Sequence, residues 1–301
     1  MSFSRKNFRK SLPYPKTHEA RKKAYSFLEI AIVILVMGIL IAGVTQGRKI
    51  IKDSEKVSAQ ILTETSPLVE TSGLLFWIEP VLDRSLGDQL NNAQISNWKD
   101  INPQTYDHII LTQSTPSKQP LYIEKAINNL PALQFDGGND YLEADIEQNP
   151  ILTPSLTIIA VAQTNSNASA QLVSTKDGGS GFDFGKIGND KLALKDHGGG
   201  SNYNFDHVFD RNPHIIILTY VSEGAQNRAT LYVDGKLIGS QTQGSSRDKS
   251  VKLFLGDKQG NSHSWDGYIA EIAILNRHLK EEERKQIETY LAKKYAIVLV
   301  N

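Results

Sequence analysis

The sequence predicts an α+β protein in which a long N-terminal helix precedes an all-β sandwich that closes with one helix. Three observations support this. An apolar run starts near residue 25 and continues as an amphipathic segment up to Pro67. From Gly73 onward, short runs of β-branched and aromatic residues alternate with Gly, Asn, Asp and Pro. A charged segment near the C-terminus carries apolar residues at helical spacing.

The N-terminal segment joins a basic stretch to an apolar one. Residues 1–24 hold eight Lys and Arg and one acid, Glu19. Residues 25–44 are apolar or small except for Glu29. A helix of this length spans about 30 Å, at about 1.5 Å per residue, which is enough to cross a bilayer. Because the basic residues precede the apolar run, we expect the N-terminus to stay in the cytoplasm and the rest to face outward.

Residues 45–66 extend this helix with a narrower apolar stripe that includes Ile50, Val57 and Ile61, and Pro67 is expected to end it. The stripe can pack against neighbouring chains or dock on the protein's own globular part. Both alternatives are open at this point.

Glu29 is an ionisable residue inside the apolar run. A charged side chain at the bilayer centre costs about 2.5–3.5 kcal/mol on insertion scales, so it usually has a partner and a role. If the chain were cut after Ala24, the new ammonium of Tyr25 would lie one helical turn before Glu29, and the helix dipole would also favour the carboxylate there. The alternative is an acid tolerated in a simple signal anchor.

The run YSFLEI at residues 25–30, with its basic leader, resembles the N-terminus of type IV prepilins and of type II secretion pseudopilins. The resemblance implies cleavage after Ala24 by a prepilin peptidase, N-methylation of Tyr25 and a role for Glu29 in filament assembly. It also implies other pilin or pseudopilin subunits as partners. The expected location is the bacterial inner membrane with the C-terminal domain in the periplasm, and after assembly a pilus, a pseudopilus or the cell surface. Ala24 in place of the usual Gly, and a long leader, depart from the family pattern.

Charge and cysteine content exclude some classes of function. The chain has 33 basic and 33 acidic residues, but after residue 24 there are 25 basic and 32 acidic ones, a net charge of −7. An acidic outer part argues against nucleic acid as a partner. Without cysteine there are no disulfides and no thiol chemistry.

The region from Gly73 contains the expected strands. Asp234-Gly235 predicts a two-residue hairpin, because a type I′ turn needs positive φ at both central positions. Many strands without intervening helices favour a β-sandwich or jelly roll. Leu279, Ile287 and Leu291 predict one terminal helix. The clearest strands are residues 74–78, 156–163, 214–221, 229–233, 251–255 and 268–275.

The segments GLLFWIEP at 73–80, PLYIEKAINNLPALQFDGGNDYLEA at 120–144, LYVDGKLIG at 231–239 and residues 254–295 resemble laminin G-like (concanavalin A-like) jelly-roll domains. The resemblance implies such a domain at residues 73–301. Since this fold hosts lectins, adhesins, enzymes and structural modules, it implies a glycan or protein ligand without naming one.

Glu143, Asp145 and Glu147 have the E-x-D-x-E spacing of the catalytic strand in laminarinase-like glucanases of this fold. The period of two in a strand puts all three on one face, where one can act as acid and another as nucleophile. However, no aromatic-lined cleft is evident beside them, and acidic residues before Asn149-Pro150 are more often part of a solvated loop. We expect no enzymatic activity, with a membrane-tethered glycan hydrolase as the alternative.

Asp136 and Asp266 are candidate calcium ligands, because this fold often binds calcium at one rim and oxygen-rich loops suit that ion. The alternative is that both carboxylates cap turns that the following glycines form. Trp265 and Asp266 are the candidate ligand-binding residues at the surface.

These observations predict three regions: a leader at 1–24, a transmembrane and amphipathic helix at 25–66 and the jelly roll at 73–301. The expected function is that of a minor pilin or pseudopilin-like subunit that presents an adhesion domain, since a large head fits a bulk filament poorly. An anchored structural domain that never polymerises is a further alternative.

Overall fold

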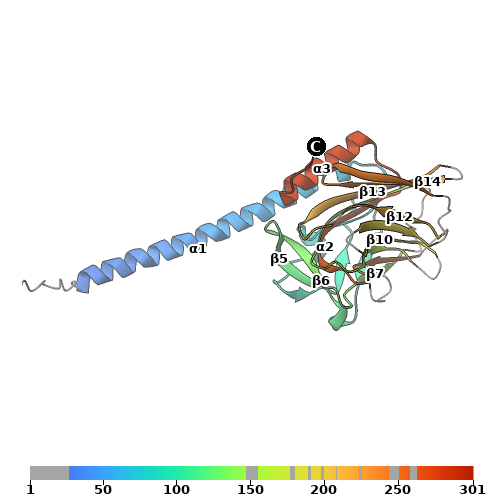
Figure 1. Ribbon diagram of the computed structural model, residues 1–301. Helices are drawn as coiled ribbons and strands as arrows, with labels where there is room; N and C mark the ends of the chain where they lie inside the picture. Colours follow the sequence, from blue (N-terminus) through green and yellow to red (C-terminus); the bar gives the residue numbers. More distant parts are fainter. Residues whose placement is uncertain are drawn as a thin grey trace, which may run out of the picture. The chain divides into compact units, whose positions relative to one another are not determined.

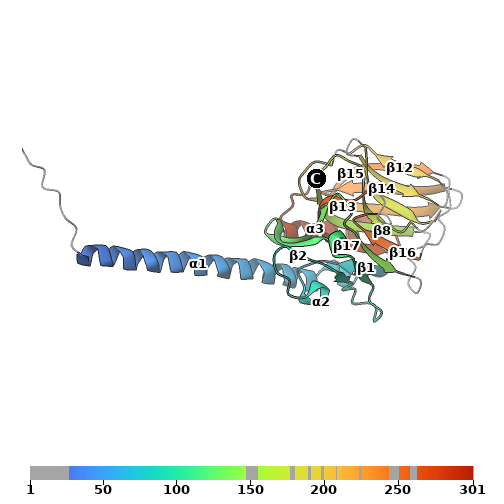
Figure 2. The ribbon, with the colours of Figure 1, turned by 90° about the horizontal axis from the view of Figure 1, so that it is seen from below.

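The computed structural model describes nine stretches of the chain, and within its first helix the side chains of residues 42–53 are also outside the description. The chain divides into two compact units, residues 1–51 and 52–301. Figures 1 and 2 show the elements of each unit. The described stretches are residues 27–146, 155–176, 180–188, 191–197, 200–207, 209–223, 226–243, 251–257 and 263–300.

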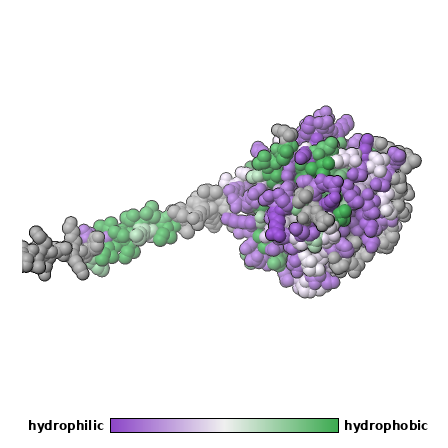
Figure 3. All heavy atoms as spheres, in the orientation of Figure 1, coloured by the Kyte–Doolittle hydropathy of each residue, from purple (hydrophilic) through white to green (hydrophobic). Residues whose placement is uncertain are grey.

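Helix α1 spans Phe27–Glu64 and contains the apolar part of the predicted helix. Its large apolar side chains up to residue 41 are exposed, from 89% for Phe27 to 48% for Val36. Figure 3 shows this end of α1 as a continuous apolar surface. None of the described helices combines the length and apolar character needed to cross a bilayer.

The last turns of α1 belong to the second unit and dock on it. Ala59 and Thr63 are buried, at 2% and 0% exposure. At the edge of this contact, Nζ of Lys56 lies 3.3 Å from Oδ1 of Asp83. The helix therefore docks through Ala59 and Thr63, beside the predicted stripe. Val57 and Ile61 of the stripe itself are 50% and 56% exposed, so the prediction that the stripe docks is wrong for these two residues. Pro67 ends the helix as expected and starts a 3₁₀ turn, η1 (Pro67–Val69).

The second unit is a sandwich of two antiparallel sheets. Sheet A has the order β15-β14-β13-β8-β17-β6-β5-β2, with β1 also paired to β17, and sheet B has the order β12-β11-β10-β9-β16-β7-β4-β3. Sheet A consists of β1 (Leu74–Ile78), β2 (Ala93–Gln94), β5 (Leu121–Ile127), β6 (Leu130–Asp136), β8 (Ser155–Thr164), β13 (His214–Glu223), β14 (Gln226–Val233), β15 (Lys236–Gln243) and β17 (Asp266–Leu275). Sheet B consists of β3 (Asn97–Lys99), β4 (Ile110–Thr112), β7 (Leu142–Asp145), β9 (Ala170–Ser174), β10 (Phe182–Ile187), β11 (Lys191–Asp196), β12 (Asn202–Phe205) and β16 (Lys252–Leu255).

The remaining elements are helical and short, except for the last. They are α2 (Asp83–Leu86), η2 (Pro116–Lys118) and α3 (Glu281–Tyr295). Asp234 and Gly235 both have positive φ between β14 and β15, so the predicted hairpin is confirmed. Helix α3 confirms the predicted C-terminal helix.

The central strands β8 and β17 of sheet A are buried on both faces, which explains their continuous apolar runs. In β8, Ile158 and Ala160 face the core between the sheets. Ile159 and Val161 face a second cluster that includes Ile287 and Leu291 of α3. A strand covered on both sides has no solvated face and so loses the polar alternation of an exposed strand.

A buried ion cluster joins α3 to sheet A. Nζ of Lys294 lies 2.8 Å from Oε2 of Glu79 and 2.9 Å from Oε2 of Glu271, and these side chains are at most 1% exposed. Burial acts to lower the pKa of Lys294, but the charges of Glu271 and Glu79 outweigh it and raise that pKa.

Glu271 also accepts hydrogen bonds from Nε1 of Trp77, at 2.8 Å, and from the hydroxyls of Tyr290 and Tyr295, at 2.9 and 3.0 Å. Burial, followed by the charge of Glu271, raises the pKa of both tyrosines well above the usual value, so they remain donors.

Replacing Lys294 by Met removes the ammonium and leaves two carboxylates buried. We expect Lys294→Met to lower the free energy of unfolding by about 3–5 kcal/mol. Denaturant unfolding of the full chain in detergent, followed by tryptophan fluorescence, measures this. Lys293→Met is the matched control at an exposed neighbour and should change stability by about 0.5 kcal/mol or less. Equal stabilities of the two variants would contradict the prediction.

Candidate functional site

The outer face of sheet B carries a groove over strands β9 to β12. Its volume is about 340 Å³. Inward-facing residues of these strands, such as Phe184 and Leu194, belong to the core, so their neighbours in each strand face outward. The lining residues are Ser169, Gln171, Asp183, Ile187, Ala193, Lys195, Asn202, Asn204 and His263.

Strand pairing arranges most of these residues in two rows that cross the sheet. The first row is Ser174–Asp183–Lys195–Asn202 and the second is Gln171–Gly185–Ala193–Asn204. The small side chain of Ala193 in the second row leaves the hollow between the amide side chains.

Gly185, in the second row, is required by the close approach of β9. A Cβ atom there would lie 2.2 Å from the carbonyl oxygen of Ala170. Any larger residue would push β9 away and displace Gln171, its pairing partner.

Asp183 is held inside the first row by two side chains. Oγ of Ser174 donates to its Oδ1 at 2.7 Å, and Nε2 of His197 lies 2.7 Å from its Oδ2. Asp183 is 2% exposed. Both carboxylate oxygens are therefore engaged with the protein.

The other polar side chains of the groove are differently placed. Within the described stretches, the side chains of Gln171, Lys195, Asn202 and Asn204 have no hydrogen-bond or ion-pair partner. Gln171 is 6% exposed, and the other three are exposed. Amides that donate and accept, beside an ammonium that donates, are suited to a ligand rich in hydroxyl groups. Sequence reasoning did not identify this groove; the signal available was the polar alternation of NYNF in β12.

The predicted acidic trio does not form a site in the described stretches. Glu143 and Asp145 share the outer face of β7, whereas Glu147 lies outside the described residues. Asp145 is exposed and pairs with Lys252 of β16 at 2.5 Å. Glu143 is separated from the groove by Phe254, which pairs with both Glu143 and Ser174 and is 2% exposed.

Asp136 and Asp266 lie opposite each other on β6 and β17. Oδ1 of Asp136 accepts hydrogen bonds from the backbone N–H groups of Gly138, at 2.7 Å, and Asn139, at 3.3 Å, as the turn-capping alternative expects. In the part of the chain that is described, no three His, Cys, Asp or Glu residues are grouped to hold a metal ion. Calcium binding stays a prediction.

The prediction that Trp265 is a surface ligand-binding residue is wrong. Its side chain is 0% exposed and belongs to the core between the sheets, and its Nε1 donates to the carbonyl of Gln163 at 3.1 Å. The polar residues before it suggested a surface loop, but the indole has enough apolar area to be drawn into the core. Asp266, beside it, is half-buried at the start of β17.

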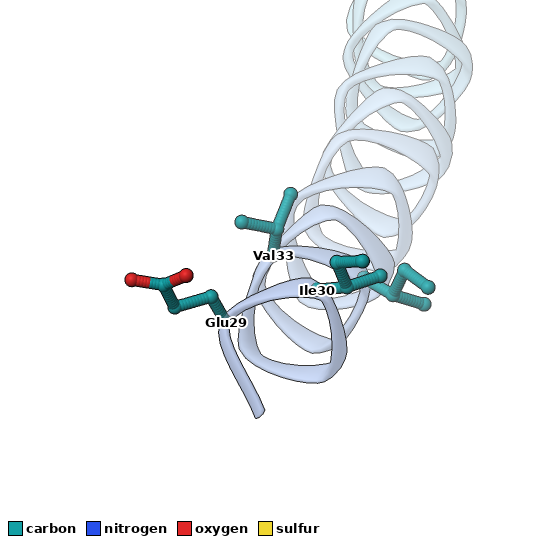
Figure 4. Close-up of a pocket in the computed structure, with 4 residues that line it drawn as sticks. Glu29, Ile30 and Val33 are labelled. Atoms are coloured by element: carbon teal, nitrogen blue, oxygen red, sulfur yellow. The ribbon is translucent and has the colours of Figure 1, made fainter. Parts of the chain in front are cut away.

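Of the predicted processing and assembly residues, Ala24 and Tyr25 lie outside the described residues, and Glu29 lies in the first turn of α1. Glu29 is exposed and lines an open hollow with Ile30, Val33 and Ile34. Figure 4 shows its carboxylate projecting away from the helix, on the side of Val33.

Comparison with known proteins agrees with this architecture. The sequence model of the concanavalin A-like lectin/glucanases superfamily matches residues 136–283. This match covers just under half of the chain and agrees with the two-sheet sandwich of the second unit. This confirms the fold that the laminin G-like resemblance predicted, and the sandwich itself starts earlier, at β1. No relative is found among curated protein sequences.

Several solved structures share the fold at low identity. The binding domain of Paraclostridial Mosquitocidal Protein 1 is 14% identical, with a TM-score of 0.49, 73% of this chain and 52% of that chain covered. Trypanosoma rangeli sialidase in complex with sialic acid is 14% identical, with a TM-score of 0.50, 75% of this chain and 34% of that chain covered. The CBM40 of Ruminococcus gnavus IT-sialidase is 15% identical, with a TM-score of 0.42, 53% of this chain and 96% of that chain covered. This chain thus spans about half of the first structure and a third of the second, and the likeness to the sialidase concerns the fold alone.

Asp140, next to the Asp136 turn, provides a pH test of this region. It is 5% exposed, and its Oδ2 accepts from the backbone N–H of Asp136 at 3.0 Å. Burial, followed by the charge of Asp136, raises the pKa of Asp140 to about 6. Between this value and the usual one near 3.8, the folded chain holds a proton that the unfolded chain has lost. The contribution of Asp140 to stability therefore falls as the pH rises through this window.

We expect Asp140→Asn to keep a side-chain oxygen that accepts from the N–H of Asp136 while removing the buried acid group. The substitution should stabilise the protein at pH 7 by about 1–2 kcal/mol, with a smaller effect at pH 4. Thermal unfolding at both pH values measures this. Asp107→Asn, at an exposed loop position, is the control. A gain that does not depend on pH would contradict the assigned cause.

Proposed function

We propose that this protein is a minor pilin-like or pseudopilin-like subunit that presents a glycan-binding domain outside the inner membrane. The observation that carries the filament part is the exposed apolar end of α1, where large side chains from Phe27 to Ile41 are about half exposed or more. Covering apolar surface is favourable by about 25 cal/mol per Å², so a segment of this kind has an occupant in its working state.

Lipid covers this segment before assembly, and the helices of sister subunits cover it afterwards. The leader and the YSFLEI run support this, because they supply the cut after Ala24 and the free ammonium of Tyr25. Glu29 then meets a positive group, either on its own chain or on a neighbour, as the helix packs.

The glycan part of the proposal is supported by the groove on sheet B. Its unpaired amides and ammonium converge on one hollow, as in small-molecule sites where a few polar groups fix the ligand. A protein of the same fold has been solved with sialic acid, which is in line with a sugar ligand. The hydrolase alternative has less support, because Asp145 is paired with Lys252 and lies apart from the groove. We therefore propose a binding role without catalysis.

Processing and assembly test the filament part. We expect the mature chain, purified from its native membrane, to begin with a methylated Tyr25, as mass spectrometry of the N-terminal peptide will show. Glu29→Gln should insert into the membrane but fail to co-assemble with other subunits, because it removes the charge that registers the helices. Glu55→Gln, an exposed acid later on α1, is the matched control. An intact Met1 in the mature pool, or normal assembly of Glu29→Gln, would refute the filament role.

Asn204 tests the groove. Asn204→Ala removes an exposed amide and should weaken saccharide binding about five-fold, the usual effect of one net hydrogen bond. The full chain in detergent is titrated with lactose, 3′-sialyllactose and the methyl glycosides of glucose, galactose, glucuronic acid and galacturonic acid by ligand-observed NMR. Asn97→Ala, at the far edge of sheet B, is the control. If Asn204→Ala and Asn97→Ala bind every sugar equally well, the groove is not the binding site.

A further inference from the structure

We propose that the groove on sheet B selects acidic glycans, with Lys195 binding the carboxylate or sulfate of the sugar. This inference rests on the proposed glycan-binding function and specifies its ligand class. It follows from how the charges of the first row are distributed and from the absence of aromatic side chains among the described residues that line the groove.

Lys195 lies between Asp183 and Asn202 in the first row. Opposite charges directly across two strands ordinarily pair. Here the carboxylate of Asp183 contacts Ser174 and His197 instead. Ser174 lies on β9, on the side of Asp183 opposite to Lys195, and His197 follows the end of β11. The neighbouring anion is thus held by other donors.

As a result, the ammonium of Lys195 has no ion-pair partner in the described stretches, although it stands at the groove. Lys191 lies on the same strand and the same face, and it is paired with Asp206. The contrast shows that β11 neutralises one of its outward lysines and leaves the one that lines the groove available.

The other lining groups favour a polar mode of recognition. Among the described residues, no Trp, Tyr or Phe lines the groove, so a sugar ring has no large aromatic platform on which to stack. Binding must come from hydrogen bonds to the amides and from charge. Charge-assisted hydrogen bonds are about twice as strong as neutral ones, which gives an acidic sugar the advantage.

The size of the groove fits this class of ligand. Its volume of about 340 Å³ is at the lower end of the range of about 300–1,000 Å³ for small-molecule sites, which suits one or two sugar units. The small side chain of Ala193 leaves room for a ring, and the amides of Gln171, Asn202 and Asn204 line the same groove for hydroxyl groups.

The test compares sugars that differ only in the acid group. The probes are methyl glucuronide against methyl glucoside, methyl galacturonide against methyl galactoside, and 3′-sialyllactose against lactose, each titrated into the full chain in detergent at low salt. We expect at least one acidic member to bind about five-fold more tightly than its neutral partner. The preference should shrink when the ionic strength is raised to about 0.5 M, since an exposed charge is screened.

Charge-matched variants assign this preference to one residue. Lys195→Gln should abolish it, Lys195→Arg should retain it, and Lys191→Gln, with the same loss of net charge on the same strand, should leave it unchanged. Equal binding of acidic and neutral partners that Asn204→Ala weakens would overturn this inference and leave the proposed function standing. Absence of binding to every probe would overturn both. An acid preference that survives in Lys195→Gln would also overturn the assignment.

Discussion

The ammonium of Lys294 is the interaction on which the arrangement of the globular unit depends. It neutralises Glu79, which follows β1, and Glu271, in the middle of β17, and it comes from α3. Two carboxylates share one cation, so the cluster is net negative and depends on neutral donors as well: the indole of Trp77, two tyrosine hydroxyls and the backbone N–H groups of Val81 and Leu82. A buried cluster of this kind adds little net stability, but α3 placed elsewhere on the sheet would leave bare charges in the core. It therefore specifies a single packing of the helix.

The position of α3 determines which surfaces remain for binding. The helix and the last turns of α1 cover the outer face of the central strands of sheet A, and sheet B covers the inner face. The outer face of sheet B is the face of the sandwich that these elements leave uncovered, and the groove lies there.

The sequence indicated the strands of sheet A better than those of sheet B. Runs such as LTIIAVAQ and HIIILTYV are mostly apolar because both faces of these strands are covered, and a run of this kind can be recognised from the sequence alone. Strands β9 to β12 are shorter, have polar outward residues and are separated by glycine-rich segments, so none was singled out. The groove itself arises from register: Gln171 and Asn204 are 33 positions apart and meet in one row only because three strand pairings align them. Composition and spacing carry no information of that kind. The same limit explains the error at Trp265, whose polar neighbours in sequence are not its neighbours in space.

Helix α1 gives the two proposed roles a physical connection. Its N-terminal turns expose apolar side chains, whereas Ala59 and Thr63 near its C-terminal end are part of the second unit. The small side chain of Ala59 permits close packing, and the hydroxyl of Thr63 donates to the carbonyl of Ala59, so neither position brings an unpaired polar group into the contact. The C-terminal turns of α1 are therefore a packed component of the second unit rather than a linker beside it.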